Sequence, residues 1–125
     1  MRRAPVRDHG AVDVSVQMLF GFIAVLFALL LLFEVVAYWH ARNVFDEAAA
    51  EGVRVAAAYD GDCADGIAAA EAMVRRHGGT WGSGTRVTCT DGAIVTVTVA
   101  GRTPGVLGNG LGLRTSVSES APKEG

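Results

Sequence analysis

The feature that most constrains the fold of this chain is an almost uninterrupted apolar run near the amino terminus. Within residues 14–33 only Ser15 and Gln17 are strongly polar, and there is no charged side chain. A helix of about 20 residues rises about 30 Å, which is the thickness of the hydrocarbon core of a bilayer. The aromatic pair Tyr38 and Trp39 follows where a membrane–water interface should lie. The run therefore predicts a transmembrane helix.

Two other interpretations of the run fit the sequence less well. A secretory signal peptide has an apolar region of about 7–15 residues and then small residues before the cut, whereas this run leads into Tyr38, Trp39 and His40. A buried helix of a soluble protein would need a large surrounding domain, and the whole chain has 125 residues.

The charges on either side of the run predict its orientation. In the arm of residues 1–10, Arg2, Arg3 and Arg7 stand against a single acidic residue, Asp8, whereas acidic residues outnumber basic ones in residues 40–62. Because positively charged flanks stay in the cytoplasm, we expect a single-pass protein of the cell membrane. Its amino terminus would be cytoplasmic and its carboxyl-terminal part extracytoplasmic.

The only two cysteines, Cys63 and Cys89, both lie on the predicted outer side, where oxidation is allowed. We expect them to form a disulfide that ties the second helix to the first strand. Closing a loop of this length stabilises a small domain by about 3–4 kcal/mol in the chain-entropy model. A pair of buried free thiols is the alternative.

The helical pattern continues beyond the membrane. Residues 38–59 contain no proline, a single glycine (Gly52) and many strong helix formers. We predict one helix from Ala11 to Tyr59, with a break at Gly52 as the alternative.

A second, shorter helix is predicted after a turn at Asp60–Gly61. Asp62 or Asp65 can cap its first turn, and Gly78–Gly79 stops it. Its predicted apolar face consists of Ile67, Ala70, Met73 and Val74.

Beyond a glycine-rich loop the period changes from 3.6 to 2. Residues 85–90 and 93–100 alternate apolar side chains and threonines, and Asp91–Gly92 predicts a two-residue hairpin turn between them. Residues 112–119 predict a last strand. The face predicted to be buried on the second strand carries Val95, Val97 and Val99.

The sequence thus predicts an α+β fold. A long amino-terminal transmembrane helix continues outside the membrane, and it covers a three-stranded antiparallel sheet together with the second short helix. The expected parts are a basic cytoplasmic arm or leader (1–10), the transmembrane and extended helix (11–59), a small extracytoplasmic α+β domain (60–120) and a disordered tail (121–125).

No group of residues indicates catalysis. His9, His40 and His77 lie in separate regions without metal-ligand spacing, and "GNGLG" lacks the lysine and the strand–loop–helix setting of a phosphate-binding loop. A net charge of −2 gives no reason to expect nucleic acid as a partner. We therefore expect no enzyme, cofactor or metal site.

One face of the long helix collects small and polar residues. In order, they are Asp13, Gln17, Gly21, Ala24, Ala28, Tyr38 and Arg42, with Glu34 at the edge. Ala24 and Ala28 form a small-xxx-small pair, which lets another helix approach closely. The carboxylate of Glu34 near the outer boundary either contacts a partner or marks the interface and reaches water. We predict that helix packing uses this face, including Gln17, Gly21, Glu34 and Tyr38.

Several motifs, taken in order, resemble one family. A basic "RDHGAV" leads directly into the apolar run, and "LLFEVVAYWHARNVFDEAAAEGVRVAAA" contains a glutamate, an aromatic–Ala–Arg group and an "AAxEGxRxAA" pattern. A cysteine-started, alanine-rich helix and threonine–valine strands follow. This order resembles the TadE-like family, pseudopilin-like proteins of the tight-adherence (Flp) pilus system.

The resemblance implies a small envelope protein that helps to assemble a pilus. Its expected partners are other pilins or pseudopilins, the membrane components of the assembly machine and the lipid bilayer. A membrane-anchored extracytoplasmic binding or sensor subunit unrelated to pili is the alternative function.

The resemblance also implies that a prepilin peptidase could cut between Gly10 and Ala11, on the cytoplasmic side. Pilin-type sites carry a glutamate at the fifth mature position, which here is Ser15, and the nearest acidic residue is Asp13. Cleavage would leave the membrane helix on the mature protein. The alternative is an uncut arm that acts as a topology signal.

Overall fold

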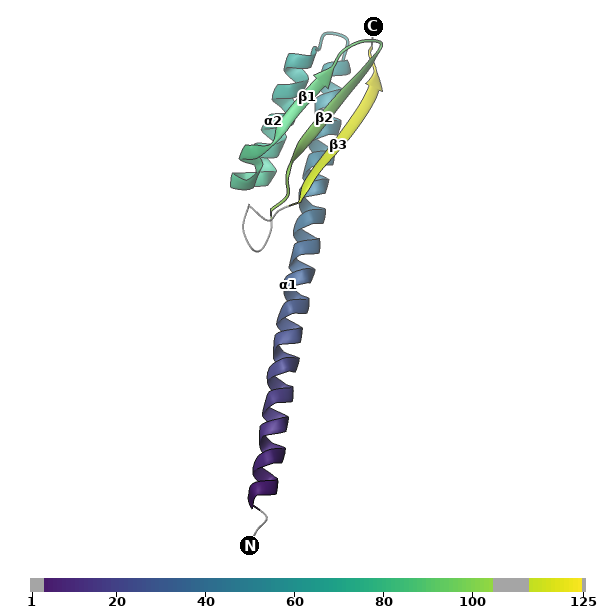
Figure 1. Ribbon diagram of the computed structural model, residues 1–125. Helices are drawn as coiled ribbons and strands as arrows, with labels where there is room; N and C mark the ends of the chain where they lie inside the picture. Colours follow the sequence, from purple (N-terminus) through teal and green to yellow (C-terminus); the bar gives the residue numbers. More distant parts are fainter. Residues whose placement is uncertain (1–3, 105–112, 125) are drawn as a thin grey trace. The chain divides into compact units, whose positions relative to one another are not determined.

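The computed structural model describes residues 4–104 and 113–124, with the backbone alone for residues 4–11 and for Thr80 and Trp81 (Figure 1). The elements in chain order are helix α1 (Ala4–Ala57), helix α2 (Cys63–Gly78), the 3-10 helix η1 (Gly79–Gly84), and strands β1 (Arg86–Thr90), β2 (Ile94–Arg102) and β3 (Arg114–Pro122). The predicted α+β fold is confirmed. The chain divides into two compact units, Met1–Glu34 and Val35–Gly125.

The first unit consists of the amino-terminal part of α1. The helix begins before the predicted Ala11 and is continuous through the whole apolar run. The run contains no proline and one glycine, Gly21, and the helix continues through that glycine.

In the second unit α1 passes straight through Gly52 and ends at Ala57. A Cβ atom at position 52 would lie 3.0 Å from the Gly66 carbonyl oxygen and 3.0 Å from a Val97 methyl carbon. Gly52 therefore permits close packing against α2 and the sheet, and the alternative of a helix break there is wrong.

Helix α2 begins as its sequence predicts. The Asp62 carboxylate accepts a hydrogen bond from the Asp65 backbone N–H at 2.8 Å, so Asp62, and not Asp65, is the cap. The buried positions are Gly66, Ala70, Val74 and Gly78. The glycine-rich segment that follows is the 3-10 helix η1, where the sequence predicted a loop.

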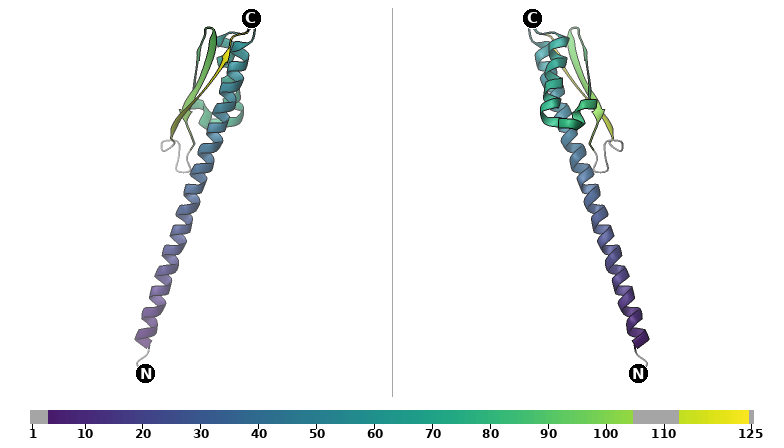
Figure 2. Two further views of the ribbon diagram at one scale, coloured as in Figure 1. Left: turned by 90° about the vertical axis from the view of Figure 1, so that its right-hand side faces the viewer. Right: turned by 90° about the vertical axis from the view of Figure 1, so that its left-hand side faces the viewer.

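The three strands form an antiparallel sheet in the order β1-β2-β3. Two views of the ribbon show α2 and the carboxyl-terminal part of α1 on the same side of this sheet (Figure 2). The inner side of β2 presents Val95, Val97 and Val99, all fully buried as predicted. They pack with Phe45 and a run of α1 alanines and with Ala70 and Val74 of α2. The helices thus cover the apolar face of the sheet.

Two sequence predictions are wrong, one about the β1–β2 connection and one about the carboxyl-terminal tail. The β1–β2 connection runs from Asp91 to Ala93, and the pair nearest to it is Thr90 with Thr96, so it is longer than a two-residue turn. The predicted disordered tail is ordered through Glu124: β3 extends to Pro122, and the Glu124 backbone N–H donates to the Ala57 carbonyl at 2.8 Å. Gly125 lies outside the described residues.

The Lys123 side chain accounts for this order. Its ammonium group donates hydrogen bonds to the carbonyls of Ala56 (2.8 Å), Ala58 (3.1 Å) and Gly61. The last carbonyls of a helix have no partner within the helix. Lys123 supplies a donor to the Ala56 carbonyl of α1 and so joins β3 to the end of the helix, which stops at Ala57, short of the predicted Tyr59.

Candidate interaction surfaces

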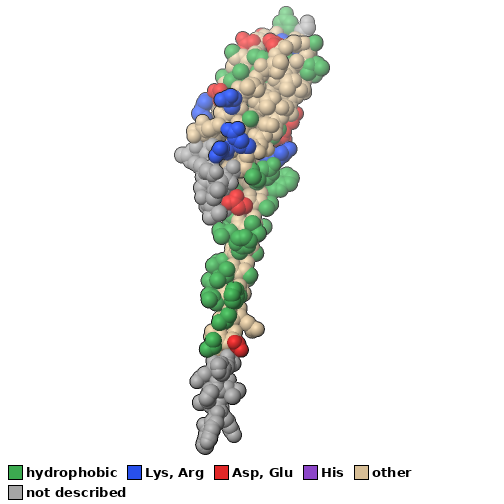
Figure 3. All heavy atoms as spheres, viewed as in Figure 1, with side chains coloured by type: hydrophobic (Ala, Val, Ile, Leu, Met, Phe, Trp, Pro, Cys, Tyr) green, Lys and Arg blue, Asp and Glu red, His purple; other side chains and the backbone are tan. Residues whose placement is uncertain are grey.

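The largest apolar surface of the chain is the apolar run of α1. Its large side chains, from Val12 to Phe33, are all exposed, and the most apolar 18-residue window has a mean hydropathy of 2.8 with none of its residues buried. Figure 3 shows these side chains around the helix. So large an exposed apolar surface marks a site of contact with a membrane or with another protein. By length and composition this helix could span a membrane.

The predicted packing face lies within this exposed segment. Gln17, Gly21, Ala24 and Ala28 are all exposed, and a Cβ atom added at Gly21 would have no neighbouring atom within 4 Å. Their spacing places them along one side of α1. The face is open to a second helix, and use of the face for packing stays a prediction.

The two remaining residues of the predicted face have different surroundings. Glu34 is half-buried. Tyr38 belongs to the second unit, where its hydroxyl forms hydrogen bonds with the side chains of Thr115 and Arg42, and these bonds lower the pKa of Tyr38. The contact with Thr115 places the start of β3 beside the first turns of α1 in this unit. Trp39 remains exposed next to it, as an interfacial aromatic residue would be.

The predicted disulfide is present. Cys63, the first residue of α2, is bonded to Cys89 of β1, with 5.6 Å between their Cα atoms. It fixes α2 to β1, which lies at an edge of the sheet formed by the described strands.

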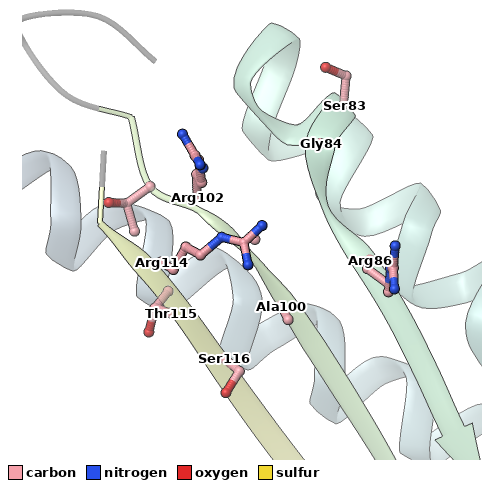
Figure 4. Close-up of a pocket in the computed structure, with 10 residues that line it drawn as sticks. Ser83, Gly84, Arg86, Ala100, Arg102, Arg114, Thr115 and Ser116 are labelled. Atoms are coloured by element: carbon pink, nitrogen blue, oxygen red, sulfur yellow. The ribbon is translucent and has the colours of Figure 1, made fainter. Parts of the chain in front are cut away.

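The outer face of the sheet is polar and contains a groove at one end. Threonines and serines cover most of this face, with hydrogen-bonded hydroxyl pairs between Thr96 and Ser120 (2.8 Å) and between Thr98 and Ser118 (2.7 Å). At the other end, residues of all three strands line a groove that includes Arg86, Arg102 and Arg114 (Figure 4). Sequence reasoning missed this group because its members come together only through strand pairing.

A carboxyl pair lies on the opposite, helix-covered side. The Glu119 side chain of β3 is hydrogen-bonded to the Asp46 side chain of α1, and this bond, with partial burial and the charge of Asp46, raises the pKa of Glu119. Asp46 is exposed and Glu119 half-buried. Both carboxyl groups are negatively charged when ionised, so the contact that they make between α1 and the sheet depends on pH.

The described residues contain no cluster of three or more histidine, cysteine or acidic side chains able to hold a metal ion. His40 and His77 are both exposed and lie on different helices. "GNGLG" falls within residues 105–112, outside the described part of the chain. Gly10 and Ala11 lie in the backbone of α1, and cleavage between them stays a prediction.

Comparison with known proteins gives no relative. No family model, curated protein or solved structure matches this chain.

Proposed function

We propose that this chain is a single-pass membrane protein that contributes to the assembly of a Tad/Flp-type pilus as a pseudopilin-like component. It acts through helix packing and protein–protein contacts, not through catalysis. The observation that supports this most strongly is α1. One continuous helix supplies both the exposed apolar segment and the buried spine of a small disulfide-bonded domain.

The exposed segment needs an apolar cover, and two covers are available to such a protein. A bilayer covers the segment before assembly, when the subunit lies in the membrane. Neighbouring helices cover it in an assembly. Packing between helices in a membrane is favoured by small residues that let backbones approach. Ala24 and Ala28, with Gly21 one turn earlier, provide such a strip.

The proposal includes the orientation. The amino terminus is cytoplasmic because the basic residues precede the apolar run. The domain that contains Cys63–Cys89 is then extracytoplasmic, in the compartment where disulfides persist.

The test is an Ala28→Leu variant of the tagged, full-length protein in its own host. The added bulk should block close approach of a partner helix, so crosslinking and pull-down should recover less pilin or assembly component. Membrane insertion, measured by resistance to carbonate extraction, should not change. Leu30→Phe is the matched control, since it adds bulk about 200° around the helix from Ala28.

Glu34→Ala tests the same face independently, and it should reduce recovery if Glu34 contacts a partner. Normal recovery with both Ala28→Leu and Glu34→Ala would identify the face as lipid-exposed surface. Recovery of no pilin or assembly component by the wild-type protein would contradict the proposed function itself.

The arginine-lined groove favours a second candidate, a membrane-anchored extracytoplasmic binding or sensor subunit. The neighbouring genes discriminate between the two functions. A secretion ATPase and two polytopic membrane proteins encoded beside this chain would favour pilus assembly.

A further inference from the structure

Three arginines converge on the outer face of the sheet from three different strands. Arg102 of β2 is paired directly with Arg114 of β3. Arg86 of β1 is paired with Ala100, two residues before Arg102, so it is a diagonal neighbour of Arg102. All three are exposed. Figure 4 shows their side chains on the same side of the sheet, and Figure 3 shows basic side chains gathered on this part of the domain.

This arrangement is unfavourable without an anion. Directly paired residues have Cβ atoms about 4.5–5.5 Å apart, and like charges at that spacing destabilise a sheet. Within residues 12–104 and 113–124, the ion pairs engage Arg54 with Glu51 and Arg75 with Glu71, and none engages the three groove arginines. Their charge is therefore available to a ligand.

Contacts inside the second unit fix which end of the domain carries these arginines. Thr115, the residue after Arg114, contacts Tyr38 near the start of α1 in this unit. Lys123, just past the other end of β3, contacts Ala56 and Gly61. Strand β3 therefore runs in the same direction as the part of α1 in this unit, and its arginine end lies beside the first turns of that part.

Few residues separate the arginine end of the domain from the apolar run. Tyr38 follows Phe33, the end of the apolar run, by five residues, which is about 7.5 Å along a helix. Arg114 precedes Thr115 by one residue in β3, a rise of about 3.4 Å. The headgroup layer extends about 5–7 Å beyond the hydrocarbon core, which is comparable with this short length of chain.

The opposite end of the domain carries the opposite charge. The α1–α2 connection contains Asp60 and Asp62, the β1–β2 connection contains Asp91, and Glu124 follows β3. These acidic residues lie at the same end of the domain as Lys123, which joins the end of β3 to the end of α1. The open basic cluster therefore lies at the Tyr38 end of the domain, and these acidic residues lie at its other end.

We propose that Arg86, Arg102 and Arg114 bind the phosphate groups of anionic phospholipids in the membrane that holds the apolar segment of α1. This inference rests on the proposed membrane insertion but not on pilus assembly. Guanidinium groups bind phosphate oxygens with two parallel hydrogen bonds. The exposed Ser116 hydroxyl at the edge of the groove offers a further donor. A bound phosphate would separate the paired charges of Arg102 and Arg114.

The test uses the full-length protein in nanodiscs of phosphatidylcholine alone or mixed with phosphatidylglycerol. An arginine-specific dicarbonyl reagent is applied, and the rate of modification at each arginine is measured by peptide mass spectrometry. Arg86, Arg102 and Arg114 should react about fivefold more slowly in the anionic discs, the effect expected for a basic residue at a charged lipid surface. The protection should disappear in 1 M salt, where the Debye length is about 3 Å.

Arg54 supplies the internal control, since it is exposed and paired with Glu51, and its rate should be equal in both discs. In an R102Q/R114Q variant, Arg86 should lose its protection. An R54Q/R75Q variant removes the same charge elsewhere and should leave the protection of Arg102 and Arg114 intact.

Equal rates for Arg102 and Arg114 in the two kinds of disc would overturn the inference. Protection in native membranes but not in anionic discs would also overturn it and would indicate an acidic protein partner. Failure of the wild-type protein to enter either disc would instead contradict the membrane span, and the inference would fall with it. Normal lipid protection without recovery of pilus components would contradict only the proposed function.

Discussion

Lys123 links the last strand to the end of the longest helix, although it lies two residues from the end of the chain. Its ammonium group donates hydrogen bonds to three carbonyl oxygens, those of Ala56, Ala58 and Gly61. It also places a positive charge at the negative end of the α1 dipole. A single side chain therefore completes the helix cap.

Replacing Lys123 by Met should lower the stability of the domain. A charge-assisted hydrogen bond contributes about 1.5–3 kcal/mol to stability, and the loss should appear as a decrease of several degrees in the midpoint of thermal unfolding in detergent. Lys123→Arg keeps the charge and the donors, so it should lose less. An unchanged midpoint for Lys123→Met would show that hydrogen bonds from water stabilise these carbonyls equally well.

The contact between Asp46 and Glu119 should make stability depend on pH. Because Asp46 raises the pKa of Glu119 in the folded protein, the folded state holds that proton more tightly than the unfolded state. The stabilisation is therefore present below the ordinary pKa of glutamate, about 4.3, and is lost as the pH rises through the raised value.

Glu119→Gln should then stabilise the protein at neutral pH, since the amide stays uncharged while it can still donate to Asp46. The gain in unfolding midpoint over the wild type should shrink as the pH is lowered toward 4. Glu71→Gln, on the exposed surface of α2, serves as a control for a simple change in net charge. A gain that is the same at every pH would contradict the proposed charge repulsion.

Among the elements, α1 and α2 approach each other through glycines. A Cβ atom added at Gly66 would lie 2.6 Å from the Ala56 Cβ and 2.7 Å from the Gly52 carbonyl oxygen, closer than real atoms approach. The glycine costs helix propensity in α2, and the close packing of the two helices offsets that cost.

Gly66→Ala should therefore destabilise the domain. The gain in helix propensity, about 1 kcal/mol, is smaller than the about 1–3 kcal/mol that overpacking costs. Denaturant unfolding of the detergent-solubilised protein measures the difference. Ala68→Gly, at an exposed position of α2, reports propensity alone. If Gly66→Ala were as stable as the wild type, α1 and α2 would be able to move apart without loss of free energy of unfolding.

The elements that sequence reasoning predicted are those that local pattern determines. Asp62 caps α2, and Val95, Val97 and Val99 form the buried face of β2, because each signal lies within a few residues. The disulfide followed from having only two cysteines. The ordered tail and the arginine groove depend on strand pairing or on contacts across more than sixty residues, as between Lys123 and Ala56. No periodicity in the sequence carries that information.

For the whole molecule, the fate of the amino-terminal arm decides which chain takes part in assembly. Gly10 and Ala11 lie within α1, so a peptidase must first unwind the helix there. Gly10 makes this easier, because a glycine weakens a helix by about 1 kcal/mol relative to alanine. The site also lies ahead of the apolar run, on the proposed cytoplasmic side.

We expect cleavage between Gly10 and Ala11, which removes residues 1–10 and with them Arg2, Arg3 and Arg7. Ser15 in place of the usual glutamate leaves the small residue before the cut in place, so it should not prevent cleavage. Intact-mass measurement of protein purified from its own host gives the answer. A Gly10→Val variant should keep the full-length mass, because a β-branched side chain replaces the small one at the cut. A full-length mass for the wild-type protein, apart from removal of the initiator methionine, would show that the arm is retained. Its three arginines would then hold the amino terminus in the cytoplasm throughout the life of the protein.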